Sequence, residues 1–545
     1  MFKQNDAHNQ QQLYSSYTDL NPKIKERLDK SWAPIFYEHI FCKIDEQPFA
    51  VLYSPDMGRT NFPVNILLSL ELIKHTFDYT DEILLDQYNL NFQIMYALGM
   101  RNLGERYLAD RTFYNFRRRV YEYTIEHPAE EDLVFGQFER LAQYFCEAAG
   151  ISTKQQRMDS TVVMSNIKLA GRLSLSFDVL QQALRICPEQ MLPEQLKEGL
   201  NPEFKTNLLF RTRSSQVPGR LQEMINLSSQ LLDLLENHKL TDSPEVALLR
   251  RFLSEQADFD QVTKTWQAKA NKDIAATSLQ SAYDPDATYR NKGGKVNKGY
   301  SLNVSETCAE ENPVQFITDY AIENSSVADT DLLIKRLPEL KENTDIEELY
   351  VDGGYYGEEV EQESQKQEVK VHYTDMTGKA PNPERISLAE FDIDADFKVC
   401  ACPEQHPPIK SNYKEKSGIV SAHFSLEHCQ HCVRKDSCPV KFQRKSAVLR
   451  VKKNSVIAAH ARKRIFDKPL RIAATSKRAA VEGTISSVKR AQGADKLDVR
   501  TYPKVRVVTG LKIIGHNIRQ LVRFFQGKVR KSVAAQQPTG VVCTF

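Results

Sequence analysis

The pattern of apolar and polar positions predicts a helical unit at the start of the chain. Apolar side chains recur at helical spacing over residues 24–40 and again after Pro63, a residue that suits a helix start. Further short helices are expected at 81–88, around 94–98, and from Asp110 or Thr112 through FYNFRRRV. These elements predict a compact N-terminal unit of several short helices.

Strand-like alternation begins after this unit. The segment QRMDSTVVMS alternates and is rich in β-branched residues, and similar patterns return in GYSLNVSETC, PVQFITDYAIEN, IEELYVDGGYY and VKVHYTDM. Helical stretches separate the later strands, and this order predicts an α/β fold with a mixed sheet. Two segments interrupt it: residues 165–275 are helical with no strand-like alternation, and residues 376–450 contain five of the ten cysteines.

The predicted elements divide the 545 residues into segments with different roles, and about 150 residues per domain suggests three or four structural units. We expect an N-terminal helical domain at 1–150, the first parts of the α/β core at 151–164 and 276–375, an all-helical insertion at 165–275, a small Cys-rich insertion at 376–450, and a basic C-terminal part of the core at 451–545.

Charge is distributed very unevenly along the chain. The net charge is +2, but residues 441–545 hold 25 Lys and Arg against Asp467, Glu482, Asp495 and Asp498, a net +21, which leaves −19 for the rest. So basic a segment predicts a polyanionic partner, most commonly nucleic acid; a merely solvated basic face is the alternative. No apolar run approaches the roughly 18 residues of a membrane span, and the polar N-terminus lacks a signal-peptide core. We therefore expect a cytoplasmic protein that is not in the membrane.

Arginines crowd the last predicted helix of the N-terminal unit. Arg117, Arg118 and Arg119 stand among aromatic residues in FYNFRRRV. Two interpretations stay open: these cations face a DNA backbone, or they are solvated while Phe113 and Phe116 fill the core.

Two carboxylates lie in predicted strands, where acidic residues are rare. Asp159 lies in QRMDST, and Asp352 ends the apolar run of ELYVDGGYYG. Acidic residues are depleted in strands and costly to bury, so each needs a partner or a metal. For one such Asp a capping role is the better interpretation, but two on adjacent elements of a sheet favour a site. Asp284 and Asp286 in DPDATYR are rival carboxylates, although DPD more often forms a turn.

A third carboxylate lies in a basic stretch. TSKRAAVEGTISSVKRAQG reads as one helix ending near Gly493, and Glu482 shares a face with Arg478 and Lys489. This arrangement is either a salt-bridged helix or a metal ligand flanked by phosphate contacts. Three carboxylates brought together can hold two divalent ions for phosphodiester displacement, and Mg²⁺ fits because it takes hard oxygen ligands.

The cysteines of residues 400–438 are clustered. Cys429 and Cys432 have the spacing with which two thiolates grip one Zn²⁺, and Cys402 and Cys438 are the expected completing pair. A structural zinc module is therefore predicted, and the alternative is a cluster without metal. No phosphate-binding GxxxxGK[ST] motif and no Ser/His/Asp order is evident, so neither an NTP-driven helicase nor an acyl-transfer enzyme has support.

The residues around Glu482 resemble a known signature. The spacing R-x3-E-x6-K through Arg478 and Lys489 is similar to that around the catalytic glutamate of bacterial insertion-sequence transposases of the DDE type, with Thr475 where that signature has Tyr. MDST, DPDATYR, YVDGGYYGEE, GLKIIGHNIRQLVRFF and RTFYNFRRRV resemble such enzymes in the same order, and the insertion-sequence 1182 family in particular. The resemblance covers nearly the whole chain. It implies an RNase H-like sheet with Asp159 on the first strand, Asp352 after the fourth and Glu482 on a late helix.

The resemblance also implies an activity and partners. A DDE transposase cleaves the ends of its element and joins the 3′-hydroxyls to target DNA with two Mg²⁺ ions at one site. Its partners are the terminal inverted repeats and target DNA; a homodimer on DNA and a location at the bacterial nucleoid are expected. The alternatives are a domesticated, non-catalytic DNA-binding protein and another RNase H-like nuclease.

Overall fold

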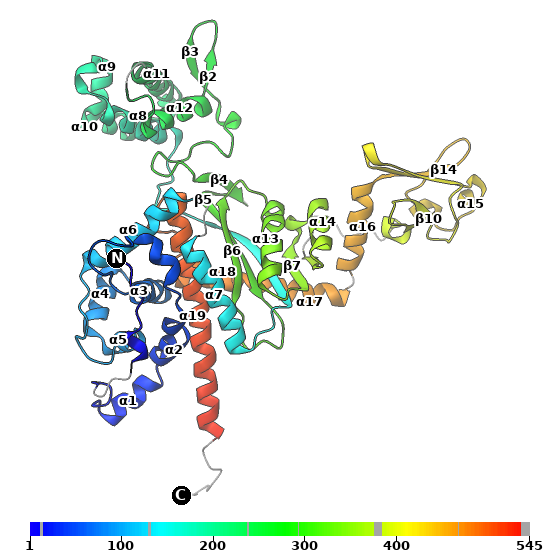
Figure 1. Ribbon diagram of the computed structural model, residues 1–545. Helices are drawn as coiled ribbons and strands as arrows, with labels where there is room; N and C mark the ends of the chain where they lie inside the picture. Colours follow the sequence, from blue (N-terminus) through cyan, green and yellow to red (C-terminus); the bar gives the residue numbers. More distant parts are fainter. Residues whose placement is uncertain are drawn as a thin grey trace, which may run out of the picture.

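The computed structural model describes residues 1–10, 15–128, 132–236, 239–292, 294–374, 384–466 and 468–535 (Figure 1). In the N-terminal unit the helix predicted over 24–40 is two helices, α1 (Pro22–Asp29) and α2 (Trp32–His39). The prediction is wrong here because the Ser31 side chain accepts a hydrogen bond from Ala33 N and starts a new helix. The other predicted helices are present as α3 (Val64–Phe77), α4 (Asp81–Leu90), α5 (Phe92–Ala97) and α6 (Asp110–Glu126).

The predicted mixed sheet is present at the centre of the molecule, and it has six strands where five were predicted. Its strands are β1 (Gln155–Val163), β4 (Thr288–Lys292), β5 (Lys295–Thr307), β6 (Ile317–Asn324), β7 (Glu348–Asp352) and β8 (Lys370–Thr374). The order is β4-β5-β1-β7-β8, with β6 also paired to β5. Strands β4, β5, β6 and β1 pair antiparallel, whereas β1, β7 and β8 pair parallel. This mixture is the pattern expected of an RNase H-like sheet.

The two faces of this sheet belong to different hydrophobic cores. Met158, Leu349 and Val351 pack with α13 (Asp329–Asn343) and α14 (Glu358–Lys366). Apolar residues of β5 and β6 pack with α7 (Leu133–Ala149), the long α19 (Tyr502–Ala535) and the N-terminal helices. Figure 1 shows α19 running beside those helices. The N-terminal unit therefore shares its core with the sheet and α19.

The helical insertion has a core of its own. Its main helices are α8 (Arg172–Ile186), α11 (Val217–Glu236) and α12 (Pro244–Gln256). The prediction of no strands fails at one place, where β2 (Ala257–Asp260) and β3 (Thr265–Ala268) form a hairpin. Phe259 and Trp266 pair across it with ring centroids 5.2 Å apart, and Asp260 Oδ1 accepts from Val262 N in the turn. The ring pair and the turn hydrogen bond both stabilise the hairpin, and neither can be seen in a hydropathy pattern.

The Cys-rich segment forms a second small sheet with its own core. Its strands are β11 (Lys410–Lys414), β12 (Ile419–Phe424), β13 (Lys441–Phe442) and β14 (Ala447–Lys452), in the order β11-β12-β14-β13. Strand β14 continues past the boundary expected at 450, while the boundary expected at 376 lies outside the described residues. The helix α16 (Lys453–Phe466) follows β14. Within the described residues no helix is long and apolar enough to cross a membrane.

Candidate active site

Three acidic side chains from three elements meet at one arginine. Asp159 lies in β1, Asp352 is the last residue of β7, and Glu482 lies in the first turn of α18 (Val481–Ala491). Arg478 Nη2 lies 3.2 Å from Asp159 Oδ2 and 3.9 Å from Asp352 Oδ2, and Arg478 Nη1 lies 3.2 Å from Glu482 Oε1. The structure thus brings the three predicted carboxylates together around a single guanidinium.

The element that carries Arg478 and Glu482 differs from the one predicted. The expected single helix is two helices, α17 (Lys468–Ala479) and α18, which meet at Ala480. Arg478 and Glu482 are still in contact across the junction. Lys489 lies farther along α18, where its Nζ donates to Val162 O at 3.0 Å and pairs with Asp495 Oδ1 at 2.7 Å. Lys489 therefore binds the end of β1 and the loop after α18, whereas Arg478 binds the acidic cluster.

A buried ion pair fixes the junction of α17 and α18 to the sheet. Arg157 of β1 donates from Nε and Nη2 to Glu306 Oε2 of β5, and from Nη1 to Lys477 O. Thr484 of α18 donates to the other carboxylate oxygen of Glu306 at 2.6 Å. Burial raises the pKa of Glu306, while the charge of Arg157 and the hydrogen bond from Thr484 act against that rise. The network holds both helices above β1, next to Asp159.

The three carboxylates differ in how they are held. The Asp159 side chain is 10% exposed and Asp352 28%, whereas Glu482 is 64% exposed. Backbone N–H groups of Ser160 and Gly354 donate to the two aspartates, each at 2.8 Å. The two aspartates are therefore fixed on the sheet, and the glutamate has room to move.

Gly354 stands where a side chain would not fit. A Cβ atom built there would lie 2.9 Å from Asp352 Oδ1. The absence of a side chain at Gly354 thus serves Asp352, because it lets the backbone N–H reach the carboxylate.

A fourth acid beside this cluster was missed by the sequence analysis. Asp329, at the start of α13, accepts a hydrogen bond from Ser160 Oγ at 2.7 Å and pairs with Arg290 at 3.5 Å. Burial raises the pKa of the Tyr355 hydroxyl, and the charges of Asp329, Asp159 and Asp352 raise it further. Asp329 opens a helix in the sequence, where an acid is ordinary, so no local signal marks it.

The rival carboxylates have other partners. Asp284 is fully buried and accepts a hydrogen bond from Tyr300 Oη at 2.5 Å. Burial, followed by the charge of Asp284, raises the pKa of Asp286. The contacts of Arg478 thus favour Asp159, Asp352 and Glu482 over this pair.

The three arginines of α6 have different surroundings. Arg117 pairs with Glu71 and Asp81, each at 2.8 Å, so its charge is used within the N-terminal unit. Arg118 and Arg119 are exposed; Arg118 lies 3.7 Å from Glu122, and Arg119 lies over the Tyr53 ring. Of the three, Arg118 and Arg119 are the side chains exposed enough to contact DNA.

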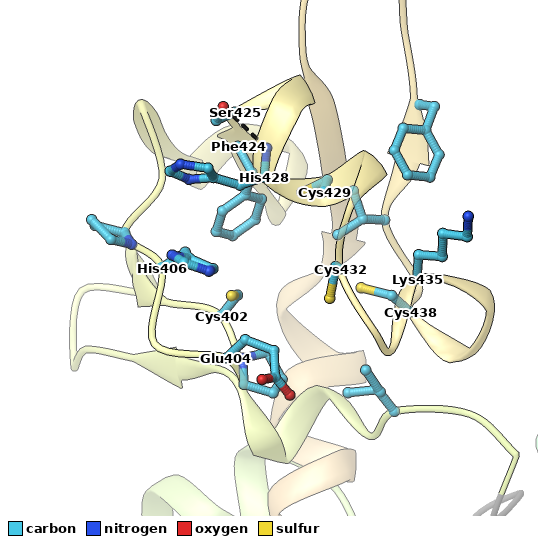
Figure 2. A pocket seen from close by; sticks show the side chains of 15 residues that line it. Cys402, Glu404, His406, Phe424, Ser425, His428, Cys429, Cys432, Lys435 and Cys438 are labelled. Atoms are coloured by element: carbon cyan, nitrogen blue, oxygen red, sulfur yellow. Dashed lines mark hydrogen bonds between the residues drawn. The ribbon is translucent and has the colours of Figure 1, made fainter.

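The four cysteines predicted to bind zinc line one pocket. Figure 2 shows Cys402, Cys429, Cys432 and Cys438 around it, with His406 and His428 at one side. Burial raises the pKa of Cys429 to about 11, with further contributions from the other three thiols. Among the described residues, however, no three His, Cys, Asp or Glu side chains are arranged so that they could hold a metal ion. The four thiols therefore lie at one pocket but are not in a metal-binding arrangement.

Two separate segments of the chain match known transposase families. Residues 399–522 match the family described as Transposase DDE domain, and residues 23–119 match the family described as Transposase domain (DUF772). The first match includes Glu482, Arg478 and the four clustered cysteines; the second covers α1 to α5 and part of α6. Together they relate the chain to DDE transposases with this N-terminal domain, and a DDE domain implies an RNase H-like fold. No curated protein and no solved structure matches the chain significantly.

Proposed function

We propose that the protein is a DNA transposase that cleaves the ends of an insertion sequence and joins the freed 3′-hydroxyls to target DNA. The observation that carries this proposal is the convergence of Asp159, Asp352 and Glu482 on Arg478. The matches to a transposase DDE domain and to a transposase N-terminal domain support it. The resemblance to the insertion-sequence 1182 family is the narrower form of the same proposal.

The DDE match implies a divalent metal. The chemistry of the donor set fits one, although among the described residues the three carboxylates surround Arg478 and are not arranged as a metal site. Asp159, Asp352 and Glu482 supply the hard carboxylate oxygens that Mg²⁺ prefers. A positive charge, the guanidinium of Arg478, already offsets their mutual repulsion. When bound, two Mg²⁺ ions would activate the attacking oxygen and stabilise the leaving one. We assign their binding to these three carboxylates.

The chain's own residues have distinct tasks in this proposal. Asp159 and Asp352 are held by backbone N–H groups on the rigid sheet, so they define the position of the scissile phosphate. Glu482 completes the set from a helix and, being exposed, can adjust when DNA enters. To Arg478, at the centre of the cluster, we assign the transfer of its hydrogen bonds from carboxylates to a phosphate. To Lys489 we assign a contact with the DNA backbone beyond that phosphate.

The test is cleavage of labelled element ends by conservative variants. Asp159→Asn, Asp352→Asn and Glu482→Gln each remove one charge and keep the shape, so each should abolish Mg²⁺-dependent cleavage and leave DNA binding largely intact. Glu310→Gln is the matched control, because this acid is 83% exposed and, in the described part of the chain, pairs with Lys477 at 3.9 Å at the edge of the site. Normal cleavage by one of the three variants would remove that residue from the site, and loss only in Asp286→Asn would transfer the site to the rival pair.

The same assay separates the alternatives. A domesticated DNA-binding protein would bind the ends and cut nothing, and another RNase H-like nuclease would cut without joining. Cutting followed by joining is the result that the transposase proposal requires. On this proposal the partners are terminal inverted repeats and target DNA, the active form on DNA is a homodimer, and the protein works at the bacterial nucleoid.

We also propose that the Cys-rich module holds a structural zinc ion. The gathering of Cys402, Cys429, Cys432 and Cys438 at one pocket supports this proposal. The thiols are not arranged as ligands in the described structure, so binding would require them to move together and lose their protons.

A further inference from the structure

The small sheet of the Cys-rich module has two chemically different faces. One face carries Val420, Ala422, Phe424 and Leu449 into the core of the module. Successive side chains of a strand point to opposite faces, so the intervening residues point outward. The outer face is therefore composed of residues that the core does not use.

All lysines and arginines of these strands lie on the outer face. They are Lys410 and Lys414 in β11, Lys441 in β13, and Arg450 and Lys452 in β14, and all five are exposed. In the sheet register Lys414 and Lys452 flank Ile419, and Arg450 lies opposite Ser421. The four strands contain no Asp or Glu, and none of the five cations forms a salt bridge within the described part of the chain.

Such a face is suited to a polyanion. A surface that only needs to be solvated normally mixes charges of both signs, whereas a field of one sign attracts the opposite charge from a distance. The core of this module needs only a polar outer face, and uncharged side chains such as those of Asn412 and Ser421 on the same face would meet that need. The concentration of positive charge therefore requires a separate explanation.

The spacing of the cations fits a nucleic-acid backbone. Lys410 and Lys414 are four residues apart, about 13 Å along a strand, and Lys414 and Lys452 are two strand spacings apart, about 10 Å. Each strand of duplex DNA carries one phosphate per roughly 3.4 Å of helix axis. The face can therefore contact several phosphates along one side of a duplex.

We infer that the outer face of the β11-β12-β14-β13 sheet binds the phosphate backbone of duplex DNA. The inference rests on the proposed function, because DNA is the substrate only if that proposal holds. Figure 1 places this sheet beyond α16, away from the central six-stranded sheet. The face would thus grip DNA at a distance from the acidic cluster, and lysine and arginine contacts of this kind position a duplex without reading its sequence.

The test measures the salt dependence of DNA binding by the full-length protein. Arg450→Gln with Lys452→Gln removes two cations of the face. Lys398→Gln with Lys435→Gln is the matched control, since both lysines are exposed in the same module and lie outside the four strands. Binding of a labelled duplex of random sequence is followed by fluorescence anisotropy over a series of salt concentrations. The face variant should lower the slope of log K against log salt by about 1.8, or about 0.9 for each lost phosphate contact, and the control should not change it.

The outcomes separate the inference from the proposed function. An unchanged slope in the face variant, with cleavage of element ends still present, would overturn the inference alone. Failure of the wild-type protein to bind duplex DNA would overturn both. If the β14 variant melted at a lower temperature, Lys410→Gln with Lys414→Gln on β11 would decide the question by the same measurement.

Discussion

At the scale of single residues, Arg478 holds together a group of charges that would otherwise repel. Its side chain is 13% exposed, and its guanidinium touches all three carboxylates, one of which, Asp159, is itself largely buried. Removing one partner of a buried ion pair leaves the other charges uncompensated. Arg478 is therefore a stabilising residue in the metal-free protein as well as a proposed phosphate contact.

Arg478→Ala should consequently destabilise the protein in a way that a divalent metal reverses. We expect a loss of about 2 kcal/mol in the free energy of unfolding when measured in EDTA, less than for a fully buried pair because Glu482 is exposed to solvent. Added Mg²⁺ should raise the melting temperature of this variant more than that of the wild type, because the ion then supplies the missing positive charge. Thermal melting with and without Mg²⁺ measures both effects.

Arg478→Lys is the control for this prediction, since it keeps the charge at the centre of the cluster. It should melt close to the wild type in EDTA. If Arg478→Ala gained no more from Mg²⁺ than Arg478→Lys does, the three carboxylates would not be the place where the ion binds.

At the scale of elements, the sequence predicted most of the central fold and less of what positions the site. Strands β1, β5, β6, β7 and β8 were predicted because each has a clear apolar alternation. Strand β4 and the strands of the Cys-rich module were not predicted. The breaks at Ser31 and Ala480 and the β2–β3 hairpin were also missed, because they arise from caps and from contacts between side chains.

The acidic site shows the same division. Asp159 and Asp352 stood out because carboxylates are rare in strands, and Glu482 because it is an isolated acid in a basic stretch. Asp329 had no such contrast with its neighbours. The Arg157–Glu306–Thr484 network joins residues more than a hundred positions apart, so only the folded structure reveals it.

The zinc prediction also belongs to the scale of elements, because it concerns the connection between α15 (Leu426–Gln430) and the strands around it. We expect about one zinc per chain by metal analysis of the purified protein. Cys429→Ser with Cys432→Ser should lose the metal together with the local order of the module. Hydrogen exchange over residues 399–452 measures that order.

Cys400→Ser is the matched control for the zinc prediction, because this cysteine is exposed in the same module and lies outside the pocket. Its zinc content should equal that of the wild type. Metal-free wild-type protein with unchanged exchange in the double variant would instead favour a thiol cluster that works without metal.

At the scale of the whole molecule, the distribution of hydrophobic cores determines which parts depend on one another. The N-terminal helices, one face of the central sheet, α18 and α19 form one continuous core, whereas the helical insertion and the Cys-rich module each have their own. Removing the N-terminal unit to test DNA recognition would therefore also expose the core that supports Glu482. The double variant Arg118→Gln with Arg119→Gln tests DNA recognition by the N-terminal unit without exposing this core, because both side chains are exposed.

Two matched substitutions test this division of the molecule. Leu70 of α3 and Leu249 of α12 are both fully buried, one in the shared core and one in the insertion. Leu→Ala at either position should cost roughly 3 kcal/mol through the cavity it leaves. Leu70→Ala should speed hydrogen exchange in α3, α19 and the central sheet together and should reduce DNA cleavage. Leu249→Ala should speed exchange only within the insertion, since its core is separate. Faster exchange in α19 of the Leu249 variant would show that the insertion and the catalytic unit unfold as one.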